Sequence, residues 1–315
     1  MFSEEREKFI QEKLSEPNNY KNRYVAFLDI LGFQNLCGIG SGMQNDDKLL
    51  KCCEIKATFN DLELLKLDYD EGLSKLISSK EIRDDTTFTI MSDSIVISAP
   101  NNNGGLIFIL YLCDKIQMML LSQGILLRGG IAEGEFFQLN NIMFGPALNE
   151  AHSIESKQAI YPRIVIANSI IDDLKNKGMF ISLADCKSID DYMHKKHLNK
   201  YINKHKDISD KRVSDCDSQI EFFIKQSEDS LYFVNYFNSF ELMKIIHSPM
   251  VEKIKSTISN GLANPREDIR MKYMWLESYY NTSIDDYINI NDLHNNKDID
   301  LSIFSQLKNE ENTNA

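Results

Sequence analysis

The sequence lacks the motifs of several large enzyme classes. It contains no Walker phosphate-binding loop, no G-x-S-x-G motif and no Ser-His-Asp pattern, so neither a P-loop nucleotide hydrolase nor a serine hydrolase is indicated. Its six cysteines show no C-x-x-C spacing, which removes the usual signal for a zinc or redox motif. We therefore expect free thiols, as in a reducing cytoplasm.

Positive charge is also scarce in this chain of 315 residues. Lysine and arginine total 35 against 47 acidic residues, which gives a net charge of -12 and a pI near 5.0. Phosphate backbones and anionic lipids must be met by a basic surface, so we expect no direct binding to nucleic acid or membrane. A nucleotide can still bind where metal ions supply the positive charge.

The chain has no long uninterrupted apolar run. Its N-terminus is charged and helical in pattern, and it lacks the apolar region of a secretory signal. The most apolar segment, residues 106–121, contains Asp114 and Lys115 and is short for about 30 Å of hydrocarbon. We interpret it as a buried helix of a cytoplasmic protein, since a hydrophobic content of 43% is ample for a core.

Hydrophobic periodicity predicts an alternation of strands and helices in the first half of the chain. The predicted elements are a strand at 24–30, helices at 33–36 and 48–65, a hairpin at 86–100, the buried helix at 106–121, a strand at 126–137, a helix opened by Pro146, and a final strand at 163–167. This order is the split βαβ arrangement of ferredoxin-like folds. We therefore expect an α+β fold with a largely antiparallel sheet and helices on one face.

The remaining residues divide into three further segments. We expect an N-terminal helix within 1–20, an α-rich extension at 169–308 and a disordered tail at 309–315. Residues 188–217 are dense in polar and charged side chains, which indicates a solvated excursion. Two amphipathic helices, at 250–260 and 266–281, are expected to pack on the first domain or to form a dimer contact.

Two aspartates mark a candidate site. Asp29 lies near the end of the first strand, on the same face as Val25 and Phe27, and a charge placed there requires a cation nearby. The alternative is that Asp29 caps the helix starting near Phe33. Asp93 lies at the tip of the hairpin. A split βαβ sheet places the first strand beside that hairpin, so we expect both carboxylates to reach a shared divalent ion, as in two-metal sites for phosphoryl chemistry.

Four segments resemble the catalytic domain of class III nucleotide cyclases: FLDILGF, MSDSIVIS, LRGGIAEG and IMFGPALNEAHSIES. The resemblance covers residues 24–167, within an expected catalytic domain at 21–168. It implies that Asp29 and Asp93 bind two Mg²⁺ or Mn²⁺ ions, that the Ile30 carbonyl also reaches a metal, and that Asn149 orients the ribose. It further implies attack of the ribose 3′-oxygen on the α-phosphorus with departure of pyrophosphate.

Three positions depart from the adenylyl cyclases of that family. Thr89 and Ile142 stand where those enzymes carry the base-reading lysine and aspartate, and Ser153 stands where they carry the transition-state arginine. We expect these three positions, together with Phe33, to line the substrate pocket. A purine cyclase would be expected to retain its purine contacts, so the departures indicate a different base.

Another cation must replace the missing arginine. Arg128 is our first candidate as a catalytic residue, and Lys157 or Arg163 are alternatives, from the same chain or a partner subunit. The alternative interpretation of Arg128 is a salt bridge to a neighbouring carboxylate. His152, in the last motif, fits either a ligand contact or a helix surface. The pair His194 and His197 indicates a solvated helix face rather than a metal site.

The departures, together with the C-terminal segment KYMWLESYYN, resemble the pyrimidine cyclases of the bacterial Pycsar anti-phage system. That resemblance implies a homodimer with sites at the subunit interface. It implies synthesis of cyclic UMP from UTP or cyclic CMP from CTP, to activate a separate effector protein. One alternative, motivated by Ser153, is a catalytically silent cyclase-like module that binds a nucleotide and signals. A weaker alternative is a palm-type polymerase or oligonucleotide cyclase.

Overall fold

The computed structural model describes most of the chain in several stretches. These are residues 2–15, 20–37, scattered positions from 44 to 60, 80–139, 142–180, 220–238 and 249–293. Most of the predicted helix at 48–65, the polar segment with His194 and His197, and the tail at 309–315 lie outside the described residues.

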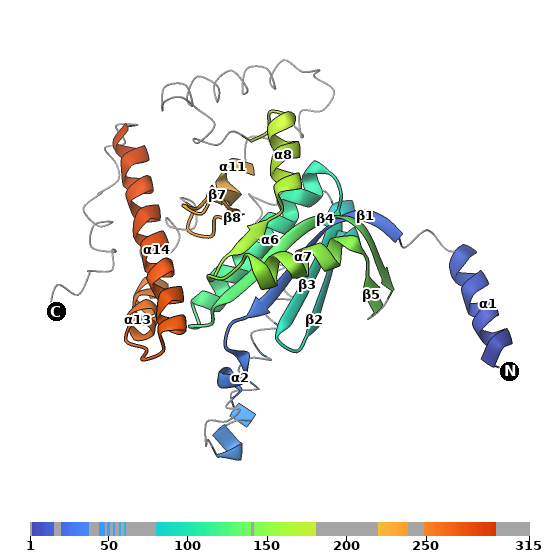
Figure 1. Cartoon of the computed structure of the whole chain (residues 1–315), viewed down its shortest axis with the longest axis horizontal. Coiled ribbons are helices and arrows are strands. Elements are labelled where there is room, and N and C mark those ends of the chain that lie inside the picture. The colour runs from blue at the N-terminus through green and yellow to red at the C-terminus, as the bar shows by residue number, and fades with distance from the viewer. Residues whose placement is uncertain are drawn as a thin grey trace.

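An α+β fold is built on one sheet of eight strands (Figure 1). The strand order is β2-β3-β1-β4-β6-β8-β7, with β5 paired to β4. The strands are β1 (Tyr20–Ile30), β2 (Thr87–Met91), β3 (Ser94–Pro100), β4 (Leu127–Leu139), β5 (Ile142–Phe144), β6 (Ile164–Ile166), β7 (Ile224–Gln226) and β8 (Tyr232–Val234). β1 therefore lies inside the sheet, with β3 paired along one of its edges and β4 along the other.

The sheet is largely antiparallel, as predicted, and one parallel pairing makes it mixed. The four strands β2, β3, β1 and β4 are antiparallel as expected, but β6 runs parallel to β4. The strand predicted at 163–167 is also not the last one. β8 pairs with β6 and β7 pairs with β8, so a later part of the chain extends the sheet. A three-residue strand such as β8 gives too weak a period for detection from sequence.

Helices cover both faces of the sheet, so the expectation of helices on one face is wrong. The even-numbered residues of β1, such as Ala26 and Leu28, join the main core with α6 (Asn103–Leu121). The odd-numbered residues point to the other face, where Val25 packs with Ala147 of α7 (Pro146–Lys157). Because successive side chains of a strand alternate between faces, α6 and α7 lie on opposite sides of β1.

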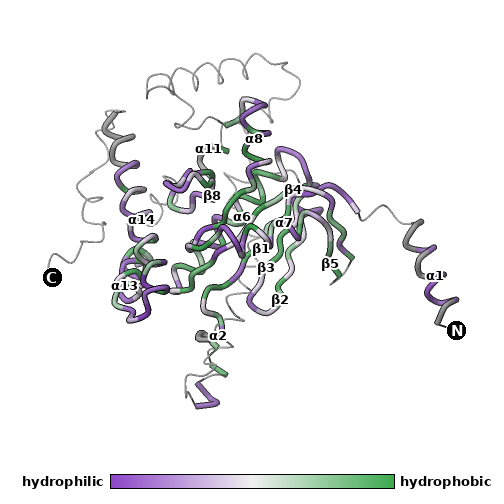
Figure 2. Tube along the Cα trace, viewed as in Figure 1, coloured by the Kyte–Doolittle hydropathy of each residue, from purple (hydrophilic) through white to green (hydrophobic). Residues whose placement is uncertain are grey.

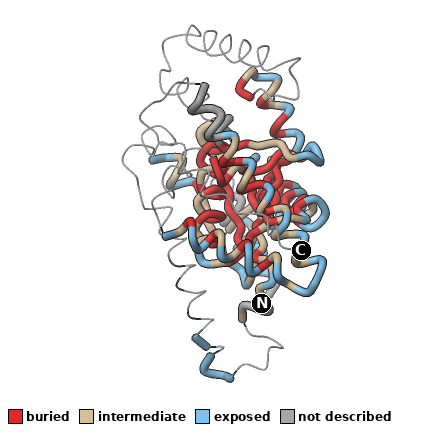
Figure 3. The backbone as a smooth tube through the Cα atoms, turned by 90° about the vertical axis from the view of Figure 1, so that its left-hand side faces the viewer, coloured by how far each residue is buried: buried red, intermediate tan, exposed pale blue. Residues whose placement is uncertain are grey.

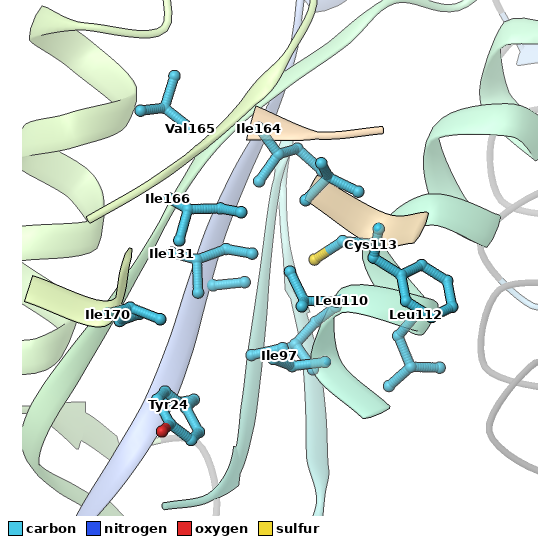
Figure 4. Packing of buried hydrophobic residues seen from close by; sticks show 14 of the residues in the cluster. Tyr24, Ile97, Leu110, Leu112, Cys113, Ile131, Ile164, Val165, Ile166 and Ile170 are labelled. Atoms are coloured by element: carbon cyan, nitrogen blue, oxygen red, sulfur yellow. The ribbon is translucent and has the colours of Figure 1, made fainter. Parts of the chain in front are cut away.

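Helix α6 is the buried helix that the sequence predicts. Its N-cap is Asn102, whose side chain accepts a hydrogen bond from the Gly105 backbone N–H. Among the described helices, α6 has the length and apolar composition that a membrane span requires, and most of it is enclosed by the fold. Core helices of soluble proteins meet the same criteria. Its partners in the core include Ile97 and Ile131, as Figure 4 shows.

Burial and hydropathy follow this layered arrangement. The buried backbone gathers at the centre of the molecule, with exposed segments around it (Figure 3). Apolar residues run along α6 and the central strands, whereas the N-terminal helix α1 (Phe2–Ser15) is mainly polar (Figure 2). Tyr24 is 4% exposed and belongs to the main core, and Cys113 is a buried free thiol.

Close packing of α7 on the sheet depends on glycine. A Cβ on Gly130 of β4 would lie 2.3 Å from the Ala151 carbonyl oxygen, so no other residue fits without a shift of the helix. Pro146 occupies the first turn of α7, as predicted, and the helix ends at Lys157. The absent side chain at Gly130 thus brings the Ala151 turn of α7 against the β1–β4 pair.

A second core lies under the C-terminal helices α13 (Met250–Leu262) and α14 (Glu267–Leu293), which match the two predicted amphipathic helices. The stripe on α14 includes Leu276 and Tyr280, both fully buried. The remaining short helices are α2 (Phe33–Leu36), α5 (Lys80–Asp85), α8 (Asn168–Asn176) and α11 (Ile220–Phe223). This core is rich in aromatic rings, including stacked Tyr161 and Trp275.

Candidate functional site

One end of β1 carries a group of charged side chains that we call the Asp29 cluster. Its members are Asp29, Asp93, Arg128, His152 and Glu155. Asp29 is the last residue but one of β1, and it pairs with Ser94 of β3 on one side and with Arg128 of β4 on the other. Directly paired residues of a sheet project their side chains from the same face, and for Asp29 and Arg128 this is the α7 face.

The hairpin tip brings Asp93 to the same strand end. The backbone N–H of Ile30 donates to the Asp93 carbonyl at 3.0 Å, which fixes the turn against the end of β1. Ser92, the preceding residue, has a φ of 57°, as a tight two-residue hairpin requires at this point. The structure therefore brings Asp93 to Asp29 and Ile30, although Asp93 lies more than sixty positions further along the sequence.

Arg128 forms the salt bridges that its alternative interpretation predicts. Its Nε lies 3.3 Å from Oδ2 of Asp29, and its Nη2 lies 2.6 Å from Oε1 of Glu155. The Glu155 side chain is only 4% exposed, whereas that of Arg128 is 27% exposed. The guanidinium therefore bridges a strand carboxylate and a helix carboxylate while one of its edges stays accessible.

Burial dominates the electrostatics of the cluster. It raises the pKa of Asp29 above its ordinary value, although the charge and hydrogen bond of Arg128 oppose the rise. The nearby Asp93 adds to the rise. The pKa of Glu155 is raised in the same way, again because burial outweighs the attraction of Arg128. The charge of Arg128 therefore does not compensate for the three carboxylates of the cluster.

The donor set suits a hard divalent cation. Asp29 and Asp93 supply carboxylate oxygens and Ile30 supplies a carbonyl, and Mg²⁺ prefers such oxygen ligands completed by water and substrate phosphate. In the described part of the chain, no group of three or more His, Cys, Asp and Glu side chains is placed to hold a metal ion by itself. A divalent ion at Asp29 and Asp93 would therefore need further ligands from water or a bound molecule.

His152 and Glu155 are the members that sequence reasoning missed or left open. The imidazole of His152 lies edge-on to Phe27, with ring centroids 4.9 Å apart, and its charge acts on Asp29. Glu155 follows it by three positions, about one turn of α7. The sequence did contain one signal for the burial of Glu155: it follows Ile154 on a helix that packs against a strand containing glycines.

The remaining predicted residues of α7 and α2 lie around this cluster without touching it. Asn149 is exposed on α7, and Ser153 is half-buried one turn later. Within the described residues, no side-chain hydrogen bond joins Asn149 or Ser153 to the Asp29 cluster. Phe33 opens α2 and packs against the main core.

The expected base-reading positions form a separate group. The amide of Gln138 on β4 donates to the Thr89 hydroxyl at 3.2 Å and accepts from the Thr87 hydroxyl at 2.5 Å. Ile142 of β5 pairs with Leu139, next to Gln138, and its side chain is 61% exposed. Thr89 pairs with Val96 of β3, which pairs with Phe27 of β1. Thr89 therefore lies two strands from β1, and Phe27 is the neighbour of Asp29 on the same face of that strand.

Two alternative cations are placed differently from Arg128. Arg163 is 1% exposed, and it binds Asp229 and the Ser227 hydroxyl beside the stacked rings of Tyr161 and Trp275. It is therefore enclosed in the core and is not a replacement for the missing arginine in its own chain. Lys157 is exposed at the end of α7.

Comparisons with family models and with curated proteins identify no relative of this chain. No protein-family model matches the chain, and a search of curated proteins finds no match either. The functional argument therefore depends on the placement of the residues.

Proposed function

We propose that the protein is a metal-dependent nucleotide cyclase that converts UTP or CTP to 3′,5′-cyclic UMP or cyclic CMP and pyrophosphate. The observation that carries the proposal is the meeting of Asp29 and Asp93 at neighbouring strand ends, in a site short of positive charge. The antiparallel order β2-β3-β1-β4 supports it, because this is the order of the split βαβ unit in ferredoxin-like folds, on which class III cyclase domains are built.

Each residue of the cluster has a role in this reaction. Asp29, Asp93 and the Ile30 carbonyl would hold two Mg²⁺ or Mn²⁺ ions. When bound, such ions offset the triphosphate charge and favour the ionised ribose 3′-oxygen. Arg128 directs its accessible N–H groups toward phosphate oxygens, and Asn149 orients the ribose. The triphosphate is then aligned so that pyrophosphate leaves opposite the attacking oxygen.

Base recognition belongs to the other group of residues. Thr89 and Ile142 replace charged purine readers with a hydroxyl and an apolar side chain, which favours a pyrimidine. From the resemblance to class III cyclases, we propose a homodimer in which one protomer supplies the Asp29 cluster and the partner supplies the base-reading group. Phe33 and Ser153 line the same pocket.

In the cell, this activity fits a second-messenger synthase of an anti-phage defence system, acting in the cytoplasm. Its product would reach a separate effector protein by diffusion, so no stable complex with nucleic acid or membrane is required. The net charge of -12 agrees with a ligand that binds through metal ions rather than through a basic surface.

A second candidate is a catalytically silent module that binds a nucleotide and signals. It is favoured by one observation: Arg128 is paired with two carboxylates of its own chain, and Ser153 offers no replacement. Binding of a non-hydrolysable UTP or CTP analogue without turnover of the natural nucleotide would support this candidate.

The test is to incubate purified protein with each of the four ribonucleoside triphosphates and Mn²⁺ and to identify the products by mass spectrometry. Cyclic UMP or cyclic CMP with an equal amount of pyrophosphate is the expected result. Formation of cyclic AMP or cyclic GMP alone would contradict the choice of substrate, and no product at all would contradict the proposed reaction.

A further inference from the structure

Helix α7 packs on the sheet near the strand ends that carry the Asp29 cluster. Gly130 lets the turn around Ala151 lie directly on the β1–β4 pair, because a side chain there would collide with the helix backbone. Glu155 is one turn further along α7, on the side that faces the sheet. A carboxylate from the helix is thereby carried down to the guanidinium of Arg128.

Burial of Glu155 requires compensation that a surface glutamate does not need. Taking a carboxylate out of water is costly unless an opposite charge meets it with good geometry. Arg128 provides that charge as an ion pair, with Nη2 2.6 Å from Oε1 of Glu155, while its Nε donates to Asp29 at 3.3 Å. Carboxylates from two elements therefore flank one guanidinium, through one hydrogen bond and one ion pair.

The remaining donors of Arg128 have a defined direction as a result. Among the described residues, Nη1 has no hydrogen-bond or ion-pair partner, and the side chain is partly exposed. A guanidinium edge with two parallel N–H groups matches the oxygens of a phosphate, and prior anchoring reduces the entropy lost when the phosphate binds.

We propose that Glu155 is the positioning residue for Arg128, holding its free edge toward the triphosphate at the α-phosphate where charge develops. This inference depends on the proposed cyclase function and adds a residue to it. Glu155 touches neither substrate nor reacting atoms, and it acts only through the orientation of Arg128. Helix α7, which carries Ser153 where an arginine is expected, thus supplies the anchor for an arginine on the strand.

A double-mutant cycle tests this role in the full-length protein. Glu155→Gln keeps the shape of the side chain and removes its charge, so kcat should fall about 10- to 100-fold while KM changes little. Arg128→Ala should lower kcat by about 100-fold or more. The double variant should be no slower than Arg128→Ala, because Glu155 has no effect without its arginine.

Ser156→Ala is the matched control, since Ser156 is exposed on the same helix and its hydroxyl touches only backbone carbonyls. It should retain wild-type kcat. Thermal unfolding of every variant checks that loss of the fold is not the cause of lost turnover. A Glu155→Gln protein with wild-type kcat, or effects of the two substitutions that multiply, would overturn the role of Glu155.

The two proposals fail in different ways. If the wild-type protein forms no cyclic nucleotide from any of the four triphosphates, the proposed function fails, and this inference fails with it. If the wild type turns over and the cycle shows independent effects, only the role of Glu155 is wrong.

Discussion

Two arginines, Arg128 on β4 and Arg163 just before the neighbouring strand β6, show how differently this fold treats an ion pair. Arg163 is enclosed by Asp229, Ser227 and two aromatic rings. Hydrogen bonds from Arg163 lower the pKa of Asp229 to about 2, and here the arginine outweighs burial. At the Asp29 cluster the balance is reversed, because burial raises the pKa of Asp29 despite Arg128.

The difference separates a structural pair from the site where we propose that a ligand binds. The carboxylate of Asp229 has its full complement of donors, and Arg163 has no edge toward solvent. Asp29 shares one arginine with Glu155 and has Asp93 beside it, so a further cation would relieve the cluster. A surplus of buried negative charge is therefore the physical signature that we connect with metal and nucleotide binding.

Loss of Asp29 should produce the largest effect. Asp29→Asn removes a metal-binding charge, so we expect kcat to fall by more than about 100-fold. Stability should stay unchanged or rise, because the carboxylate is unfavourable where it is buried. The cyclic-nucleotide assay and a thermal melt measure the two effects. Full activity in Asp29→Asn would show that the carboxylate holds no metal.

Arg163→Ala should show the opposite profile, with loss of stability. The substitution removes hydrogen bonds to Asp229 and Ser227 and the contacts with the rings of Tyr161 and Trp275, which we expect to cost about 3 kcal/mol of unfolding free energy. Urea denaturation is the measurement, with the exposed Lys157→Ala as control. An unchanged midpoint would remove the distinction between the two arginines.

Gly130→Ala should damage the Asp29 cluster through packing alone. The new methyl group would press on the Ala151 carbonyl and on Ile154, so we expect a loss of about 1–3 kcal/mol. Because the displaced helix carries Glu155, kcat should also fall in the protein that remains folded. A melt and a turnover assay, compared with Ser156→Ala, check both; wild-type values would contradict the close approach of α7.

The free energy of unfolding at acid pH should depend on the ionisation of Asp229. Its pKa falls from 3.8 to about 2 on folding, so the folded state binds this proton less tightly than the unfolded state does. The stabilisation is complete above about pH 4 and is lost as the pH falls from about 4 to 2. Urea midpoints of Asp229→Asn should therefore change less over this range than those of the wild type. Parallel curves would contradict the lowered pKa.

Much of the local structure could be predicted from the sequence. The strand with Asp29, the hairpin with Asp93, the buried α6 and the two C-terminal helices carry strong periodic or turn signals, and the structure contains each of them. The meeting of Asp29 with Asp93 also followed from the strand order of a split βαβ unit. Each of these features is encoded by the hydrophobic periodicity or the turn residues of a short stretch of chain.

The partners of Arg128 and Arg163 could not be predicted. Arg128 follows Leu127 and Arg163 follows Pro162, and both arginines were candidates for the missing cation. Only tertiary packing assigns Glu155 to one and Asp229 to the other, since these contacts join elements that are distant in the chain. Likewise, β6 through β8 are three-residue strands, whose pairing is decided by the surrounding core.

The most direct test of the account is calorimetric titration of Mn²⁺, with a non-hydrolysable UTP or CTP analogue present, into the wild type, Asp29→Asn and Asp229→Asn. We predict that the wild type and Asp229→Asn bind the metal alike and that Asp29→Asn loses at least tenfold in affinity. Equal binding by the wild type and Asp29→Asn would contradict the assignment of the Asp29 cluster as the metal and nucleotide site.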